Sequence, residues 1–387
     1  MTRKMGMVFL GVLLLALGCG SDSSDDSDDP NDKENETDTG DTDNEGNKLV
    51  RLTTPQSEFA PNNIESAIDD IVDALNDEEA EVGMKLAFVP KELENFFAAA
   101  VLGANRAHSE LGALGNVVAP TLTDEGATAW DLQRDIIDDQ IANGAVGLGV
   151  APHSVDVTPS IDAAVDAGAT VITFDSDAAD SKRQLYIGTI NKQAGKTGGE
   201  TLAELLGDKV GTVVILGYDD TIWQDGYDRT HEARKALEAA GHTVVIRQTD
   251  WGDHQGNVDF IQETLENAEP EAVGCLGVFA NSYGCAEAAV AAGVEDDITI
   301  VAFDTEPETL QYMDDGIIQA THAQRIYYMG YMIPFLLYAA NTIGLDETKS
   351  LVSDLMVDEE RIDTGLDVIH ADSIGDYNLF LDELGDL

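Results

Sequence analysis

Two stretches decide the fold: Thr170–Asp177 reads TVITFDSD, and Thr299–Glu306 reads TIVAFDTE. Each is an apolar, β-branched run ending in Phe-Asp, a pattern typical of buried parallel strands. Open α/β sheets bind ligands just beyond the carboxyl ends of their strands, so Asp175 and Asp304 are expected at a shared cleft. An ionised Asp accepts several hydrogen bonds, which suits a ligand rich in hydroxyl donors, such as a sugar. Alternatively, each Asp caps the helix that follows it.

The same pattern continues along the chain. Short apolar runs alternate with longer helical patterns, which predicts an α/β fold with two doubly wound parallel-sheet lobes. The strands are expected at 84–90, 116–121, 145–152, 170–175 and 185–189 in the first half, and at 211–217, 243–248, 272–279, 298–304 and 317–324 in the second. Helices are expected near 95–111, 124–143 and 155–167, and an additional amphipathic helix, carrying Ile64 to Leu75, precedes the first strand.

The N-terminus indicates export. Arg3 and Lys4 precede an apolar stretch that ends in Leu-Gly-Cys, so residues 1–18 are predicted to be a signal peptide. The Gly18-Cys19 step is similar to a bacterial lipobox, which implies lipid attachment at Cys19; a plain signal peptide is the alternative. Residues 19–48 are then a tether, because the stretch from Ser21 to Lys48 has twelve carboxylates and two lysines and too little apolar surface to fold. The protein is expected at the periplasmic or outer face of a membrane, touching it only through lipid.

The formal net charge is −53, and the folded part is itself strongly acidic. Such a surface repels polyanions, which argues against nucleic acid and anionic lipid as partners. Salt screens repulsion between carboxylates, so a saline habitat is one explanation for this composition.

Cys275 and Cys285 lie in a strand and in the first turn of the next helix, so their α-carbons are expected to be too far apart for a disulfide. We predict two buried free thiols. No metal site and no cofactor are predicted, because His and acidic residues do not recur at metal-ligand spacing around these cysteines. His153, His231 and His242 are expected at solvated positions.

From about Met84 onward the chain resembles the type I periplasmic binding proteins, in particular the ribose-binding-like branch that supplies sugars to ABC transporters. The resemblance rests on motifs in order: ENFF (94–97), VITFDSD (171–177), YIGT (186–189) leading to Asn191, VAFDTEPETL (301–310) and THAQ (321–324). It implies a monomer that binds a monosaccharide or polyol between two lobes and delivers it to a transporter permease.

The resemblance also implies how the chain divides. A segment with the amphipathic helix occupies 49–82, the N-terminal lobe takes 83–191 and 324–352, and the C-terminal lobe with its tail takes 192–323 and 353–387. Three chain segments join the lobes and form the hinge, and ligand is trapped by closure about it.

When the ligand-binding positions of this family are carried over to the sequence, the resemblance implies ten site residues: Glu94, Phe96, Phe97, Asp175, Ser176, Tyr227, Trp251, Ser282, Asp304 and Gln324. The aromatic rings would sandwich the sugar, and the two aspartates would accept its hydroxyls. Ser176 stands where ribose-binding members have an arginine after the first aspartate. Tyr227 is predicted to replace the second-lobe arginine that binds the sugar ring in those members, and Arg229 follows it two residues later. In the second lobe, 281–283 covers the place of the family's asparagine. The polar-aromatic residues of 223–227 are expected to build a pocket wall.

Two other functions fit the residue types less well. A glycosidase could use Asp175 and Asp304 as acid and base. However, Ala194–Gly199 (AGKTGG) lacks the first glycine of a P-loop, and no G-x-S-x-G elbow is present, so we predict no catalytic residues. A sensor of the same fold would present bound sugar to a chemoreceptor or histidine kinase, and nothing in the chain separates it from a transport protein.

Overall fold

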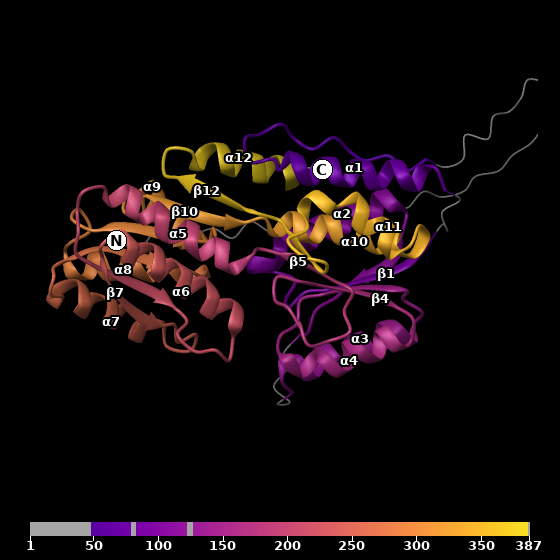
Figure 1. Ribbon diagram of the computed structural model, residues 1–387, viewed down its shortest axis with the longest axis horizontal. Helices are drawn as coiled ribbons and strands as arrows, with labels where there is room; N and C mark the ends of the chain where they lie inside the picture. The colour runs from indigo at the N-terminus through magenta and orange to yellow at the C-terminus, as the bar shows by residue number, and fades with distance from the viewer. Residues whose placement is uncertain (1–47, 79–82, 122–126, 386–387) are drawn as a thin grey trace, which may run out of the picture. The chain divides into compact units, whose positions relative to one another are not determined.

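The computed structural model describes residues 48–78, 83–121 and 127–385, which form two six-stranded sheets (Figure 1). The signal peptide, Cys19 and the tether lie outside these residues. In spatial order the first sheet contains β2 (Leu114–Val117), β1 (Lys85–Val89), β3 (Gly147–Val150), β4 (Thr170–Phe174), β5 (Leu185–Gly188) and β11 (Arg361–Asp363). The second contains β7 (Thr243–Gln248), β6 (Thr212–Gly217), β8 (Ala272–Gly277), β9 (Thr299–Phe303), β10 (Ala320–Gln324) and β12 (Leu366–His370).

The two sheets share one topology. The first five strands of each half have the order 2-1-3-4-5 and pair in parallel, as in doubly wound sheets, so the predicted fold class is confirmed. β12 pairs antiparallel with β10. β4 and β9 are almost entirely buried, which explains their continuous apolar runs. The second strand begins at Leu114, two residues earlier than predicted, and is an edge strand with mostly exposed side chains.

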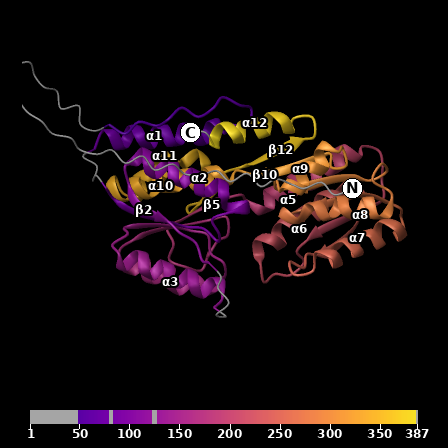
Figure 2. The same cartoon turned by 180° about the vertical axis from the view of Figure 1, so that it is seen from behind.

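Helices cover both faces of each sheet (Figures 1 and 2). In the first lobe α2 (Ala98–Leu111) and α10 (Ile326–Thr342) pack together, and α3 (Ala129–Ala142) packs with α4 (Thr158–Asp166). In the second lobe the pairs are α5 (Asn191–Leu206) with α6 (Gln224–Ala239) and α7 (His254–Asn267) with α8 (Gly284–Ala292). The described chain also has two further helices, α9 (Pro307–Asp314) and α11 (Leu345–Leu351). Short helical turns lie next to several of the longer helices: η1 (Asn95–Phe97), η2 (Val155–Val157), η3 (Ala280–Tyr283) and η4 (Ser353–Leu355). No helix of the described part is long and apolar enough to cross a membrane.

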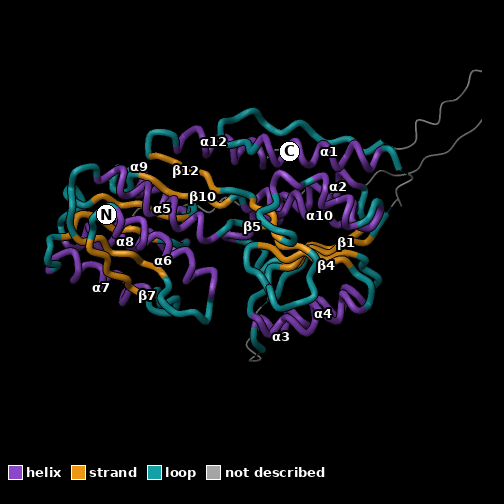
Figure 3. The backbone as a smooth tube through the Cα atoms, viewed as in Figure 1, coloured by secondary structure: helices purple, strands orange, loops and turns teal. Residues whose placement is uncertain are grey.

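Three chain segments connect the sheets: β5 to α5, β10 to α10, and β11 to β12 (Figure 3). The sequence places all of 353–387 with the C-terminal lobe, but β11 pairs in parallel with β5 of the first sheet. The chain therefore stays in the first lobe until Asp363 and enters the second only with β12. The predicted boundary at residue 353 is wrong, because a three-residue edge strand carries too little pattern to be recognised.

The predicted amphipathic helix is α1 (Asn62–Asn76), which buries Ile64, Ile68, Ile71 and Leu75. It packs on α10 and α11, and the purple α1 ribbon lies beside them in Figure 1. Arg51 fixes the preceding segment, since its guanidinium contacts Glu65, Asp69 and the Tyr331 hydroxyl. Residues 48–76 therefore belong to the helical layer of the first lobe.

The C-terminal helix α12 (Ile374–Gly385) follows β12 and contacts α9 in the second lobe. Its Tyr377 ring packs edge-on against Phe59 of the N-terminal segment, with ring centroids 5.1 Å apart. Because the segment around Phe59 is attached to the first lobe, this contact links the two ends of the chain beside the three connections.

The two cysteines form a disulfide, with α-carbons 5.9 Å apart, so the prediction of free thiols is wrong. The distance is short because η3 turns the chain back immediately after β8, which places the first turn of α8 over the strand. Both cysteines are fully buried. The disulfide closes the loop that carries Phe279 and Ala280.

Candidate functional site

The two strand-end aspartates adopt an unusual backbone conformation. Asp175 has φ of 60° and Asp304 has φ of 63°, and with Asn95 they are the non-glycine residues of the described chain that lie in the left-handed region. Such a conformation costs on the order of 1 kcal/mol and is concentrated at functional sites. The backbone amide of Asp304 is fixed by the carbonyl of His322, 2.9 Å away. The left-handed turn directs each residue out of its strand.

Neither aspartate acts as a helix cap in the described chain. The element after Asp175 is strand β5, and the N-cap of α9 is Glu306 rather than Asp304. The cleft interpretation therefore accounts for both residues, and the capping alternative accounts for neither.

Both aspartates line one cavity of about 540 Å³, which we call the cleft cavity. Its lining combines aromatic rings with charged and amide groups from both lobes: Lys91, Phe96, Phe97, His153, Asp175, Ser176, Asn191, Trp223, Asp225, Arg229, Trp251, Phe279, Ala280, Asp304 and Gln324. Seven of the ten predicted site residues are among them. A volume of this size is in the range of small-molecule sites, which also combine apolar walls with a few polar groups.

Aromatic side chains come from both lobes. Phe96 and Phe97 stand edge to face on the first-lobe side, with ring centroids 5.1 Å apart. On the second-lobe side Trp223 stacks on Phe279 at 5.0 Å, and Trp251 lies 5.7 Å from the same ring. Trp251 is 58% exposed, which places it at the rim. Trp223 and Asp225 of the predicted wall 223–227 do line the cavity.

Arg229 organises the floor of the cavity. Its Nε donates to Asn191 Oδ1 at 2.8 Å, Nη1 to the Val278 carbonyl at 3.0 Å, and Nη2 to Gln324 Oε1 at 3.1 Å. Gln324 in turn donates from Nε2 to Asp304 Oδ1 at 3.0 Å. Burial lowers the pKa of Arg229, while the charges of Asp304, Asp175 and Asp225 oppose that effect. This network joins residues of two of the three connections between the lobes.

The prediction that Tyr227 replaces the second-lobe arginine is therefore wrong. Arg229 and Asp225 are four residues apart on α6, and a helix places such residues on one face. Tyr227 lies between them in sequence and thus on another face, where its ring stacks on His231 with centroids 3.9 Å apart.

Burial controls the ionisation of the acidic groups. Burial raises the pKa of Asp304 to about 6, and the Arg229 charge and the Gln324 hydrogen bond only partly offset this. The pKa of Asp225 is also raised by burial. A hydroxyl donor placed against Asp304 would stabilise its ionised form and return its pKa toward the ordinary value.

Lys91 and His153 also line the cavity, and the sequence did not indicate them. The Lys91 Nζ lies 3.0 Å from Asp175 Oδ2 and donates to the Ser176 hydroxyl as well. His153 Nε2 donates to the Lys91 carbonyl at 2.9 Å, and burial lowers its pKa, so this ring is not a solvated one as predicted. Both residues follow the ends of parallel strands, β1 and β3. The strand-end rule that identified Asp175 could also have found them.

Two predicted residues besides Tyr227 lie outside the cleft cavity. Glu94 is exposed and lines a neighbouring pocket with Lys91 and His153. Ser282 is fully buried, where its hydroxyl donates to the Phe279 carbonyl and accepts from the Phe303 amide at 3.0 Å. Its contacts hold η3 against β9, which is a structural role. His242 is buried as well, at 6% exposure, rather than solvated.

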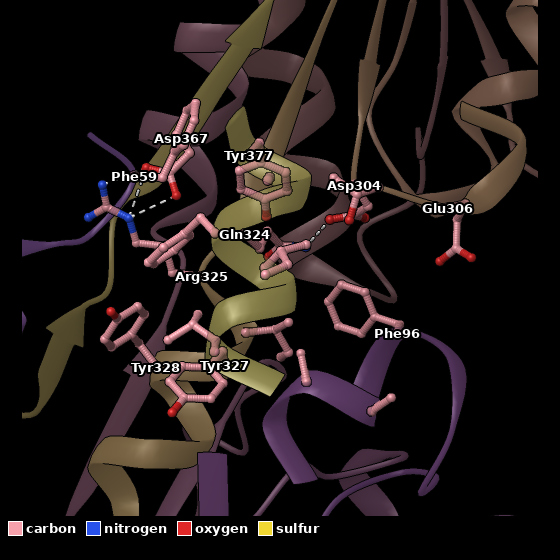
Figure 4. A pocket seen from close by; sticks show the side chains of 18 of the residues that line it. Phe59, Phe96, Asp304, Glu306, Gln324, Arg325, Tyr327, Tyr328, Asp367 and Tyr377 are labelled. Atoms are coloured by element: carbon pink, nitrogen blue, oxygen red, sulfur yellow. Dashed lines mark hydrogen bonds and ion pairs between the residues drawn. The ribbon is translucent and has the colours of Figure 1, made fainter. Parts of the chain in front are cut away.

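A second cavity, of about 430 Å³, adjoins the first (Figure 4). Phe96, Asp304 and Gln324 line both, and Figure 4 shows the hydrogen bond from Gln324 to Asp304 at its edge. On its far side Arg325 pairs with Asp367, at 2.6 Å from Nη2 to Oδ1. Residues that line the cleft cavity thus lie directly on the connection between the lobes.

Comparison with known proteins agrees with this architecture. The family model described as periplasmic binding protein domain matches residues 86–342. A solute-binding protein of an ABC transporter from Burkholderia graminis C4D1M, solved with D-arabinose, is 27% identical, with a TM-score of 0.60 over 76% of this chain and 97% of that one.

Two further structures show the same fold. GanP, a glucose-galactose binding protein from Geobacillus stearothermophilus, is 24% identical, with a TM-score of 0.60 over 76% of this chain and 99% of that one. A sugar-binding protein of a sugar ABC transporter from Bacillus halodurans is 23% identical, with a TM-score of 0.62 over 75% and 98%. The model match covers most of the chain. The chain therefore belongs to the periplasmic binding protein family, a family of solute-binding proteins rather than enzymes.

Proposed function

We propose that this protein is an extracytoplasmic solute-binding lipoprotein that captures a monosaccharide or related polyol between its lobes and delivers it to an ABC transporter permease. The observation that carries the proposal is the convergence of Asp175 and Asp304, both in left-handed conformations, on one cavity walled by aromatic rings. Carboxylates accept hydrogen bonds from sugar hydroxyls, and aromatic rings cover the apolar C–H face of a sugar.

The charges of the cavity favour a neutral ligand. Three carboxylates, from Asp175, Asp225 and Asp304, face two cationic groups, from Lys91 and Arg229. Both cations already contact groups of the protein. A sugar acid or sugar phosphate would add negative charge to a site where carboxylates already outnumber cationic groups, so a neutral, hydroxyl-rich molecule fits better.

A thermal-shift screen of the folded domain against monosaccharides and polyols tests ligand binding, because a ligand that binds only the folded state raises its stability. D-Arabinose, D-glucose and D-galactose are the first candidates, since related proteins of this fold are described with them. One sugar should raise the melting temperature of the wild type but not of an Asp175→Asn variant. A shift that persists in that variant would place the ligand elsewhere, and no shift with any sugar or polyol would contradict the proposal.

Delivery to a permease is tested in cells. Deleting the gene should abolish uptake of the sugar that the screen identifies. Normal uptake combined with loss of a sugar-induced transcriptional response would instead favour a sensor.

The lipid anchor is proposed from the Gly18-Cys19 step alone. Replacing Cys19 by Ser should move the protein from the membrane fraction to the soluble fraction. Unchanged membrane association of the Cys19→Ser variant would remove the lipoprotein part of the proposal.

A further inference from the structure

A short loop holds the aromatic side chains of the second lobe in the cleft cavity. This loop, residues 278–283, joins β8 to α8, and its Phe279 and Ala280 line the cavity. Trp223 stacks on the Phe279 ring with centroids 5.0 Å apart, and Trp251 lies 5.7 Å from the same ring. We call Phe279, Trp223 and Trp251 the second-lobe rings. Their arrangement depends on the path of the loop, because two of the rings pack on the one that the loop carries.

The disulfide closes the two ends of this loop. Cys275 lies in β8 before the loop, and Cys285 lies in the first turn of α8 after it. Every residue of the loop therefore lies inside the covalent ring that the bond closes. Neither cysteine is among the described residues that line the cleft cavity, so the bond acts on a bound ligand through the loop and not by contact.

Hydrogen bonds also restrain the loop. The Val278 carbonyl accepts from Arg229 at 3.0 Å, and the Ser282 hydroxyl accepts from the Phe303 amide at 3.0 Å. The Phe279 ring has no polar group, so it is held by packing alone and moves with its backbone. Because Val278 binds Arg229, a shift of the loop would disturb the floor of the cavity as well as the second-lobe rings.

Aromatic rings that cover a ligand bind it best when they are in place before it arrives. If the ligand has to order them, the entropy lost reduces the affinity. Constraining a loop in its bound conformation removes this cost, and a disulfide is one such constraint. The bond between Cys275 and Cys285 constrains the loop that carries Phe279, so it should preserve the arrangement of the second-lobe rings in the ligand-free protein.

We propose that Cys275 and Cys285 are positioning residues whose disulfide pre-organises the second-lobe rings, so that the chain binds its ligand tightly only in the oxidised state. This inference rests on the proposed sugar-binding function. The bond forms by exchange with a disulfide donor: the two Sγ atoms lose their protons and join, and the disulfide of the donor is reduced to two thiols. Disulfides form in oxidising compartments rather than in the cytoplasm, so tight binding becomes a property of the exported protein.

The first test compares the oxidised and reduced forms of the wild type. The reduced form is prepared by unfolding and refolding in a reductant, and thiol titration confirms both states. Calorimetric titration with D-arabinose, D-glucose and D-galactose is carried out well below the melting temperature. The sugar that binds should bind the reduced form about tenfold more weakly, which is the cost of ordering one or two aromatic side chains. Reoxidation with oxidised glutathione should restore the affinity.

A second test separates positioning from stability. Cys275→Ala combined with Cys285→Ala removes the bond without burying a hydroxyl group, and this variant should bind like the reduced wild type. The control is Leu206→Ala, which removes a buried side chain at the end of α5 that lies farthest along the helix from Asn191 of the cleft cavity. The control should also have a lower melting temperature, because it leaves a cavity in the core, but it should bind the sugar like the wild type.

A third test asks whether the bond acts through Phe279. The Phe279→Leu substitution removes the ring on which the other two pack. Breaking the disulfide in this background should change the affinity by less than about threefold, because the ring that the bond positions is absent.

Three results would overturn the inference while leaving sugar binding intact. If the reduced wild type and the alanine pair bind the sugar as tightly as the oxidised wild type, the bond only stabilises the fold. An equal loss of affinity with and without the Phe279 ring would show that the bond acts elsewhere. A reduced chain that does not fold would show that the bond is required for folding rather than for positioning. Failure of the proposed function looks different, because the oxidised wild type itself would then bind no sugar.

Discussion

Replacing Asp304 by Asn should change stability and ligand affinity in opposite directions. Asparagine tolerates the left-handed φ of 63° and keeps an oxygen that can accept from Gln324. The substitution therefore removes the charge of the side chain with little change in shape. An Asp304→Ala variant would instead add backbone strain and lose the acceptor.

The structure sets the size of the stability effect. Raising the pKa of Asp304 from 3.8 to about 6 corresponds to a cost of about 3 kcal/mol for the ionised form in the folded state. This shift already includes the attraction of Arg229, so the neutral variant should be more stable at pH 7.5, by up to about 3 kcal/mol. The folded state binds the proton more tightly than the unfolded state, so the wild type loses this stability as pH rises from about 4 to above 6. The difference between the proteins should disappear near pH 4.

The effect on binding has the opposite sign. Ligand hydroxyls favour the ionised carboxylate, so binding should release a proton near pH 6, and wild-type affinity should rise as pH increases through 6. The variant keeps only a neutral acceptor and should bind more weakly by about 1 to 2 kcal/mol at pH 7.5, without the pH dependence.

Denaturant unfolding at pH 4.5 and 7.5 measures stability, and calorimetric titration in buffers of different ionisation enthalpy measures affinity and proton release. Asp314→Asn at the exposed end of α9 is the matched control and should change neither. A variant that is less stable than the wild type at pH 7.5 would refute the argument that burial makes the charge costly. Unchanged affinity would refute the assignment of Asp304 to the site.

Four further outcomes follow from the same structure. Trp251→Ala should weaken sugar binding by about 1 kcal/mol in calorimetric titration. It should leave the melting temperature unchanged, because the ring is 58% exposed. A lower melting temperature would show that Trp251 packs in the core instead. Arg229→Met should lower the free energy of unfolding by about 3 kcal/mol in denaturant titration, because it leaves buried acceptors unpaired. A variant as stable as the wild type would contradict the structural role of Arg229 in the cavity. Replacing both Cys275 and Cys285 by Ser should cost about 2 to 3 kcal/mol, and free-thiol titration of the unfolded wild type should find neither cysteine reactive. Raising NaCl from 0.1 to 1 M should raise the melting temperature, because the net charge is −53 and the Debye length falls from about 10 to 3 Å, which screens repulsion between the carboxylates. A lower melting temperature at 1 M NaCl would argue against charge repulsion.

Local pattern was sufficient for the fold. The continuous apolar, β-branched runs of β4 and β9 predict strands that are buried on both faces. Their alternation with helical patterns predicts helical crossovers between parallel strands. Asp175 and Asp304 were identifiable because strand ends of a parallel sheet meet at one edge. The residues that pattern identified correctly are those whose position depends on their own strand.

Tertiary structure decided the features that depend on how separate elements meet. The turn of η3 brings Cys285 back to Cys275, and the phase of α6 directs Arg229 rather than Tyr227 into the cavity. β11 acquires its partner only after the chain has crossed between the sheets twice. Lys91 finds Asp175 across 84 residues of sequence. Hydrophobic periodicity records which side of an element is buried, but it carries no information about which distant side chain will lie within hydrogen-bond distance, because that depends on the packing of the whole fold.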